Sequence, residues 1–433
     1  MFVSKEALET EKEHVEGFSP EVAWVTKSGQ SDLQNPIAIR PTSETIMYPA
    51  YAKWIHSHRD LPYKLNQWSN VVRWEFKHPT PFIRTREFLW QEGHTAHATE
   101  EDATNFVYNI LECYAKTYEE LLAVPVVRGR KSKDETFAGA YFTTTTEIYV
   151  PVSGRGIQGA TSHQLGQNFA KMFKIWFLDE NNEKKQVWQT SWGFSTRSIG
   201  AMIMVHSDDQ GLVLPPKVAQ TQVVIIPIEK QGQDSTGIKT KCEEIYQQIK
   251  ASGIRVVYDD NMNNNAGWKF NHWEQRGVPI RLEVGIKDIE KNEVRCCKRN
   301  DGKKQQLSQE GIVNSVQKIL EDIHQEMYDK ALQARLSHVK NIDNWADFME
   351  ALNHRNLCMA PWCDVQQCEI DVKERSKEES LKQMEEKGEE EVSLTGSAKT
   401  LCIPKEQEPL KEGECCFACG KPATVRALWG RSY

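Results

Sequence analysis

The chain has 433 residues, which at roughly 100–200 residues for each domain indicates two to four domains. Hydrophobic residues make up 39% and charged residues 27% of the sequence, so a sizeable core is expected and wholesale disorder is excluded. The formal net charge of −7 excludes a polycation of the histone type, and the lack of any apolar stretch approaching about 18 residues excludes an ordinary transmembrane helix.

Arginine, aromatic and small polar residues recur in blocks through the first zone of the chain, residues 1–217. In one block Arg73 and Glu75 are two positions apart, so in a strand their side chains point to the same face of the sheet. Taken alone, such a pair is explained by a simple cross-strand ion pair. Phosphate-loop and dinucleotide-binding proteins are excluded, because neither G-x4-G-K-[ST] nor a strand-placed G-x-G-x-x-G occurs. The blocks are residues 39–45, 71–75, 84–94, 157–163 and 191–200.

The block 84–94 gives the clearest indication of a binding pocket. As a strand it would place two arginines, two aromatic rings, a carboxylate and an imidazole on one face, a set that is costly to bury as core. Arginine forks match phosphate oxygens and an aromatic ring stacks on a base, so we predict a pocket for a phosphorylated aromatic ligand. The six residues are Arg84, Arg86, Phe88, Trp90, Glu92 and His94.

Strands and helices alternate in the second zone, residues 218–328. Short runs of β-branched residues predict strands, and apolar residues at helical spacing predict helices. This alternation favours a small α/β domain with a largely parallel sheet. The predicted strands are 223–226, 254–257 and 280–284, and the predicted helices are 236–251 and 310–335.

Eleven cysteines, an odd number, argue against a disulfide framework in a chain whose first residues show no secretory signal. Cys363 and Cys368 form a C-x4-C pair, and Cys416 and Cys419 form a C-x2-C pair further on. Four thiolates at such spacings predict a closed, structural zinc site. Cys415 leaves open which member of the second pair is a ligand, and a set of unrelated buried thiols is the alternative interpretation.

Taken together, the blocks resemble the class II aminoacyl-tRNA synthetases, and among them the prolyl-tRNA synthetases of the eukaryote and archaeal type. The resemblance extends over essentially the whole chain. In chain order it concerns the amino-acid-binding loop, motif 2 with its Arg-x-Glu signature, motif 3, two stretches of the anticodon-binding domain and the C-terminus. These segments are 40–44, 72–75, 193–200, 267–274, 278–285 and 430–433.

The resemblance implies an α+β fold in which an antiparallel sheet flanked by helices (1–217) precedes an α/β anticodon-binding domain (218–328) and a small zinc-binding α/β domain (329–433). It implies proline--tRNA ligase activity: proline and ATP give prolyl-adenylate and pyrophosphate, and tRNA(Pro) then takes the prolyl group. ATP with Mg²⁺ and a structural Zn²⁺ are the implied cofactors. A cytoplasmic location, a homodimer, a multi-synthetase complex and no membrane association complete the expectation.

The resemblance also assigns roles to individual residues. Arg73 and Arg197 would be catalytic, and Gln158 would help to hold magnesium. No residue of the set is an obvious general base, so catalysis would rest on positioning and electrostatics. The implied proline-binding residues are Thr42, Glu44, Arg73, Trp90, Glu92, His94, His163, Ser191 and Gly193. The implied ATP-binding residues are Arg73, Glu75, Arg84, Thr85, Phe88, Gln158, Thr161, Ser195 and Arg197.

In the implied anticodon-binding domain an aromatic and basic cluster suits splayed single-stranded bases. Each aromatic residue of the cluster is equally well explained as core. The candidates are Trp268, Lys269, Phe270, Trp273 and Arg276.

Residues 1–4 resemble the segment that follows motif 1, which builds the dimer interface of the family. We therefore expect the chain to lack motif 1, with weaker dimerisation and turnover as the consequence. An inactive synthetase-like protein that binds RNA or acts as a scaffold is the alternative function. A threonyl or glycyl enzyme is a further alternative, which the blocks around Glu44 and His163 disfavour.

Overall fold

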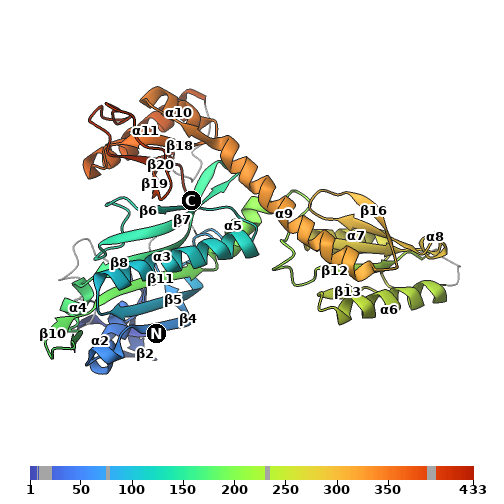
Figure 1. Ribbon diagram of the computed structural model, residues 1–433, viewed down its shortest axis with the longest axis horizontal. Coiled ribbons are helices and arrows are strands. Elements are labelled where there is room, and N and C mark those ends of the chain that lie inside the picture. Colours follow the sequence, from blue (N-terminus) through green and yellow to red (C-terminus); the bar gives the residue numbers. More distant parts are fainter. Residues whose placement is uncertain (7, 9–21, 75–78, 230–234, 388–395) are drawn as a thin grey trace. The chain divides into compact units, whose positions relative to one another are not determined.

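The structure is a computed structural model, and its backbone contacts divide the chain into two compact units, which are described separately (Figure 1). The described residues are 1–6, 8, 22–74, 79–229, 235–387 and 396–433. The first unit comprises residues 1–116, 126–201 and 337–433, and the second comprises residues 117–125 and 202–336. No helix in these ranges is both long enough and apolar enough to cross a membrane.

A ten-stranded sheet organises the first unit, in the order β17-β18-β20-β19-β6-β7-β8-β11-β5-β4. Every neighbouring pair is antiparallel except β17–β18, which confirms the predicted antiparallel sheet. The strands are β4 (Tyr63–Val72), β5 (Glu87–His97), β6 (Val127–Arg130), β7 (Phe142–Val150), β8 (Arg155–Gly166), β11 (Trp188–Ser195), β17 (Val339–Asn341), β18 (Leu357–Trp362), β19 (Lys399–Pro404) and β20 (Val425–Gly430).

Helix α3 (Glu100–Lys116) covers β5, β8 and β11. Its acidic first turn suits the positive end of the helix dipole, and its buried residues recur at helical spacing. Helix α2 (Glu44–Trp54) buries Tyr48 and Tyr51 on the same unit. The smaller elements are β1 (Phe2–Ser4), β2 (Trp24–Ser28), β3 (Ser31–Ile39), a 3-10 turn (His58–Asp60), α4 (Asn168–Met172), β9 (Trp176–Leu178), β10 (Lys184–Gln186) and α5 (Arg197–His206).

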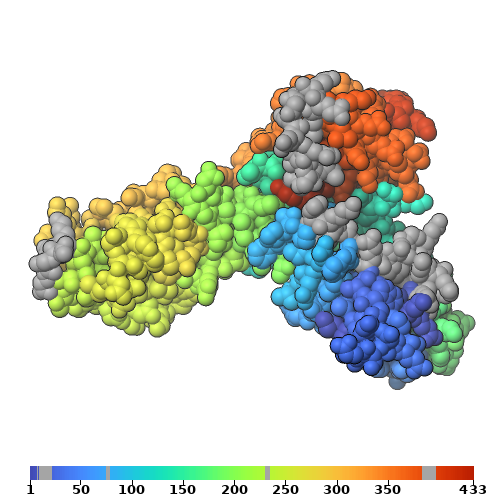
Figure 2. Space-filling model, turned by 180° about the vertical axis from the view of Figure 1, so that it is seen from behind, coloured from blue at the N-terminus to red at the C-terminus, as the bar shows by residue number. Residues whose placement is uncertain are grey.

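The C-terminal module, defined here as residues 337–433, continues the ten-stranded sheet, because β19 pairs with β6. A Cβ at Gly129 of β6 would lie 2.7 Å from Cys402 of β19, so the close approach of these strands requires glycine. Figure 2 shows the orange and red residues of the module next to teal residues of the same unit. Its helices are α10 (Trp345–Asn353) and α11 (Gln366–Lys387), which pack around buried Trp362 and Trp429.

The second unit has a five-stranded sheet in the order β13-β12-β14-β15-β16. The first three strands are parallel, as expected, but β15 and β16 are antiparallel, so the sheet is mixed rather than largely parallel. The connections of β15 and β16 are too short for a parallel crossover. The elements are β12 (Val223–Pro227), α6 (Thr236–Ala251), β13 (Val256–Tyr258), α7 (Ala266–Gln275), β14 (Ile280–Val284), α8 (Ile286–Glu290), β15 (Glu293–Lys298), β16 (Lys304–Ser308) and α9 (Ile312–His338), with a π-helical turn (Thr117–Leu121).

Candidate active site

Strand register brings the predicted residues of the first unit into rows. Ser191 of β11 lies between His94 of β5 and His163 of β8, and Gly193 lies between Glu92 and Thr161. Because side chains alternate along strands, these rows face one side of the sheet. They form the floor of a cavity of about 230 Å³.

This first cavity gathers most of the residues assigned to proline and ATP. A Cβ at Gly193 would lie 2.9 Å from the Trp90 ring, so glycine is required for the ring to lie over that strand. Glu75 lies outside the described residues, and Thr85 lines neither this cavity nor its neighbour. The predicted residues that line the first cavity are Thr42, Glu44, Arg73, Phe88, Trp90, Glu92, His94, Gln158, Thr161, His163, Ser191, Gly193, Ser195 and Arg197.

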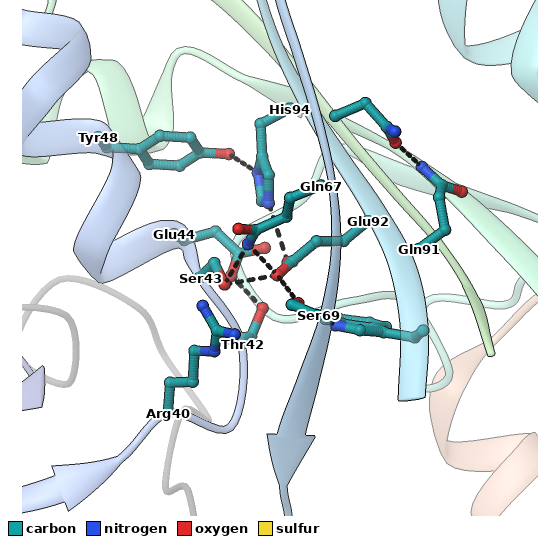
Figure 3. Close-up of polar contacts among 12 residues, drawn as sticks. Arg40, Thr42, Ser43, Glu44, Tyr48, Gln67, Ser69, Gln91, Glu92 and His94 are labelled. Carbon is teal, nitrogen blue, oxygen red and sulfur yellow. Dashed lines mark hydrogen bonds and ion pairs between the residues drawn. The ribbon is translucent and has the colours of Figure 1, made fainter. Parts of the chain in front are cut away.

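A buried cluster of carboxylates and imidazole forms one end of the cavity (Figure 3). His94 Nε2 lies 3.1 Å from Glu92 Oε2, and Tyr48 hydroxyl lies 3.0 Å from His94 Nδ1. Glu92 and His94 are each only 1% exposed. Burial alone would raise the pKa of Glu92, but the contact with His94 holds this pKa below its usual range. Burial alone would lower the pKa of His94, but the nearby carboxylates of Glu92 and Glu44 raise it above its usual value.

Neighbouring polar groups hold this cluster in place. Ser43 Oγ donates a hydrogen bond of 2.5 Å to Glu92 Oε1, and Gln67 Nε2 donates one of 2.6 Å to the same oxygen. Thr42 Oγ1 donates to the Glu44 carboxylate. A buried pair of carboxylates beside one imidazole suits a ligand that carries an ammonium group.

His163, at the other end of the row from His94, is held differently. Its Nδ1 lies 2.8 Å from Thr143 Oγ1, its Nε2 lies 3.1 Å from Thr161 Oγ1, and the Phe137 ring lies 4.8 Å away, centroid to centroid. Burial, with Arg73 and His94 nearby, lowers the pKa of His163 to about 3. The cavity therefore combines one imidazole that favours the charged form with one that stays neutral at pH 7.

Cations line the other end of the cavity. Arg73 Nε donates to Pro41 O at 3.0 Å, and its guanidinium lies 5.4 Å from the Phe88 ring centroid. Arg197 Nε donates to Ile83 O at 2.9 Å. These bonds to backbone carbonyls fix both guanidinium groups in place, where they suit a phosphate and a base.

A second cavity of about 240 Å³ shares Arg73, Gln158 and Arg197 with the first. Arg84 lines only this second cavity, where its Nη2 donates to Tyr433 O at 2.7 Å. No local pattern predicted three further polar contributors, which lie far apart in the chain: Lys131, Glu147 and Lys399. Ser432 and Tyr433 also line this cavity and belong to the segment 430–433, to which the resemblance assigned no role.

The prediction that Arg84 and Arg86 lie in the strand, on the same face as Phe88 and the residues after it, is wrong. Strand β5 begins only at Glu87, and a turn bounded by the Thr80–Arg84 bridge precedes it. The backbone N–H and C=O of Arg84 bond to Thr80 and close this turn, so they do not join the sheet. The Arg86 guanidinium instead lies 4.4 Å from the Trp74 ring centroid and lines neither cavity.

The four cysteines predicted as metal ligands come together in the C-terminal module. The Sγ atoms of Cys363, Cys368, Cys416 and Cys419 all lie within 4.8 Å of one another, and two of the pairs are 3.7 Å apart. Tetrahedral zinc with Zn–S bonds of about 2.3 Å places its sulfurs about 3.8 Å apart, so the four thiols fit this metal. Cys416 belongs to the cluster, whereas Cys415 is exposed and bonds to Gly413 O.

Comparisons with known proteins agree with this geometry. Models of three families match: the tRNA synthetase class II core domain (G, H, P, S and T) at residues 24–206, the anticodon binding domain at 222–319, and the C-terminal domain of prolyl-tRNA synthetase at 345–433. The cytoplasmic proline--tRNA ligase of Arabidopsis thaliana is 54% identical over all of this chain and 79% of its own length. The chain belongs to the prolyl-tRNA synthetase family.

Other family members extend the comparison. A crystal structure of prolyl-tRNA synthetase from Cryptosporidium parvum, complexed with halofuginone and AMPPNP, is 51% identical, with a TM-score of 0.93 over 100% of this chain and 86% of that one. The putative proline--tRNA ligase YHR020W of Saccharomyces cerevisiae is 52% identical, and the bifunctional glutamate/proline--tRNA ligase of Mus musculus is 50% identical. The chain spans 64% and 29% of the lengths of these two relatives.

Four of the anticodon-binding candidates lie on α7 of the second unit, and Arg276 caps the C-terminus of this helix. Lys269 is buried, and its Nζ lies 3.2 Å from Asp259 Oδ1; Trp273 Nε1 donates to the same carboxylate at 2.8 Å. Trp268 and Arg276 are exposed, while Phe270 lies under the Arg281 guanidinium. Trp268 and Arg276 are therefore the candidates that face solvent, and Lys269 and Trp273 anchor Asp259.

We predict a pH-dependent contribution of His163 to stability. Its folded pKa of about 3 lies below the ordinary value of 6.5, so between these values the unfolded chain binds a proton that the folded chain does not. Stability therefore falls as pH drops through this window, by up to about 1.4 kcal/mol per pH unit. In thermal unfolding at pH 5, 6 and 7, His163→Gln should lose less Tm toward pH 5 than the wild type.

His206 and His324, whose pKa burial lowers to about 4, supply a background slope that both proteins share. The exposed His354 provides the control, because His354→Gln should keep the wild-type slope. Equal slopes for His163→Gln and the wild type would contradict the prediction.

Proposed function

We propose that this chain is a proline--tRNA ligase, which activates L-proline with ATP and transfers the prolyl group to tRNA(Pro). The observation that carries the proposal is the junction of two cavities. A buried carboxylate and imidazole cluster suits the ammonium of proline, and the adjoining arginines suit the phosphates of ATP. Family membership favours this substrate pair over threonine or glycine.

In the first step a carboxylate oxygen of proline attacks the α-phosphorus of ATP, and the bond to the pyrophosphate oxygen breaks. The proline carboxylate is ionised near pH 7, so no general base is needed. Arg73 lines both cavities, where it would bridge the carboxylate and the α-phosphate and stabilise the charge that develops on the phosphate oxygens. In the second step a terminal ribose hydroxyl of the tRNA attacks the prolyl carbonyl, and AMP leaves.

The remaining residues would bind and orient the substrates. Glu44, Thr42 and His163 would surround proline, with Trp90, Glu92, His94, Ser191 and Gly193 completing its pocket. Adenine would lie between Phe88 and Arg197, with Glu75 and Thr85 at its edge, Thr161 and Ser195 on the nucleotide, and Arg84 on the outer phosphates. Gln158 would help to hold Mg²⁺, which neutralises phosphate charge when bound. The four clustered thiolates would hold a structural Zn²⁺.

We also propose a cytoplasmic homodimer. The Arabidopsis relative is named as cytoplasmic. Strand β4 is an edge strand of the sheet, and Trp68 on it is 80% exposed next to exposed Leu89, an apolar patch that a second copy would cover. Association with other synthetases is supported by the bifunctional glutamate/proline relatives.

Proline-dependent exchange of pyrophosphate into ATP tests the function. We expect exchange with L-proline and ATP, and none with threonine or glycine, because the chain belongs to the prolyl-tRNA synthetase family. Transfer to tRNA(Pro) should follow when the tRNA is added. Equal exchange with threonine, or tRNA binding without any exchange, would replace this proposal by another synthetase or by an RNA-binding protein.

A further inference from the structure

The segment 131–141, which connects β6 and β7, is held from outside by the C-terminal module. Four side-chain contacts at consecutive places along the segment join it to that module. Lys131 Nζ donates to Leu401 O at 2.7 Å, Ser132 Oγ donates to Glu369 Oε1 at 3.0 Å, Gln366 Nε2 donates to Asp134 Oδ1 at 3.0 Å, and Lys399 Nζ lies 3.3 Å from Glu135 Oε2.

These contacts differ from ordinary surface contacts, because several of their groups are buried. Ser132 is 1% exposed and Glu369 is 2% exposed. A buried polar group that loses its partner costs about 1–3 kcal/mol, so the contacts hold the segment firmly. Although burial favours its neutral form, the charges of Lys399 and Lys131 keep the pKa of Glu135 below its usual range. We name the four contacts the clamp.

The inner side of the same segment forms a wall of the first cavity. Glu135 and Phe137 of the segment line that cavity together with Thr143 of β7, and the Phe137 amide donates to Thr143 Oγ1 at 3.0 Å. Thr143 Oγ1 in turn lies 2.8 Å from His163 Nδ1, and the Phe137 ring packs on the same imidazole. Within the segment the Glu135 amide donates to Ser132 Oγ at 3.3 Å. A continuous set of contacts therefore leads from Glu369 to His163.

We propose that the C-terminal module shapes the amino-acid end of the cavity through the clamp, with Ser132 and Lys399 as positioning residues. The inference rests on the proposed function, since it names the proline subsite. Release of the segment would move Phe137 away from His163, while Thr143 stays opposite His163 in the β7–β8 pairing and Arg73 and Arg197 keep their own anchors on Pro41 and Ile83. The loss should therefore fall on proline binding and not on ATP binding.

The test is steady-state kinetics of ATP–pyrophosphate exchange for Ser132→Ala and Lys399→Met. We expect the KM for proline to rise about tenfold in each, with the KM for ATP within twofold and kcat within threefold of wild type. Lys399→Arg should restore the proline KM, because it keeps the charge beside Glu135. Lys405→Met is the matched control: Lys405 lies in the same module, pairs with Glu112 at 3.7 Å and lines neither cavity.

Several results would overturn the inference. An unchanged proline KM in both variants, or an equal rise in the two KM values, would show that the clamp does not act on the proline subsite. A rise confined to the KM for ATP in Lys399→Met would make Lys399 a phosphate ligand instead, since it also lines the second cavity. If the wild type lacks exchange, the proposed function fails, and deuterium uptake of residues 131–143 still tests the clamp. Faster uptake in Ser132→Ala but not in Lys405→Met supports the clamp, and equal uptake refutes it.

Discussion

Replacement of Arg73 by alanine is expected to lower kcat/KM for proline activation roughly 10³-fold, a loss comparable with removal of a main charge-stabilising donor in other enzymes. Arg73 lines both cavities, and its Nε bond to Pro41 O holds the guanidinium at their junction. The charge that builds up at the α-phosphate would lose its principal partner. Arg73→Lys should recover little, because one ammonium cannot reproduce a planar fork.

The measurement is ATP–pyrophosphate exchange over a range of proline and ATP concentrations, together with thermal unfolding. The matched control is Arg86→Ala, in the same turn region, because Arg86 stacks on Trp74 and lines neither cavity. We expect the control to stay within threefold of wild type. If Arg73→Ala kept a tenth of the activity with an unchanged Tm, Arg73 would not be the group that stabilises the transition state.

Local patterns predicted the elements that local forces determine. Helix α6 coincides with the predicted range 236–251, since its apolar residues have helical spacing. Strand β14 coincides with the predicted range 280–284, since its apolar and β-branched residues favour a strand. The antiparallel β15–β16 hairpin escaped prediction because its sequence alternates weakly and β16 is largely exposed. The start of β5 was predicted too early because alternation was extended through Arg84 and Arg86 across a proline-bounded turn.

The first cavity was largely predictable because its residues form unusual blocks of charge and aromatic rings. Its remaining wall was not, since Phe137 and Thr143 are common core residue types with no local signature. Contacts between distant parts of the chain also carry no local signal: Glu135 and Lys399 are 264 residues apart in the sequence. Lys269 was predicted as an anticodon-binding residue but is buried beside Asp259. A lysine among aromatic residues is equally consistent in sequence with RNA binding and with a buried ion pair.

Replacement of Cys368 by serine is expected to abolish binding of the proposed zinc and to unfold much of the C-terminal module. Cys368 is buried in the hydrophobic cluster that includes Phe417 and Trp429, and its Sγ lies 3.7 Å from Cys416 Sγ. Structural zinc sites contribute roughly 10–16 kcal/mol of apparent binding free energy in small zinc domains at pH 7. This range is comparable with the whole net stability of a typical domain, which is about 5–15 kcal/mol.

Metal analysis should give one equivalent of zinc for the wild type and none for Cys368→Ser, with a lowered Tm in thermal unfolding. Cys415→Ser is the matched control, because Cys415 is exposed and outside the cluster, and it should keep the zinc and the Tm. Retention of one equivalent in Cys368→Ser would refute the assignment.

Helix α11 connects the four-cysteine cluster to the first cavity. Gln366 and Glu369, which contact Asp134 and Ser132 in the clamp, flank Cys368 on the first turns of α11. A four-thiolate zinc site is closed and takes no part in chemistry, so any effect on proline must pass through these neighbours. We therefore expect partial zinc removal by a chelator to raise the proline KM before the KM for ATP. An equal effect on both substrates would mean that zinc supports only the stability of the module.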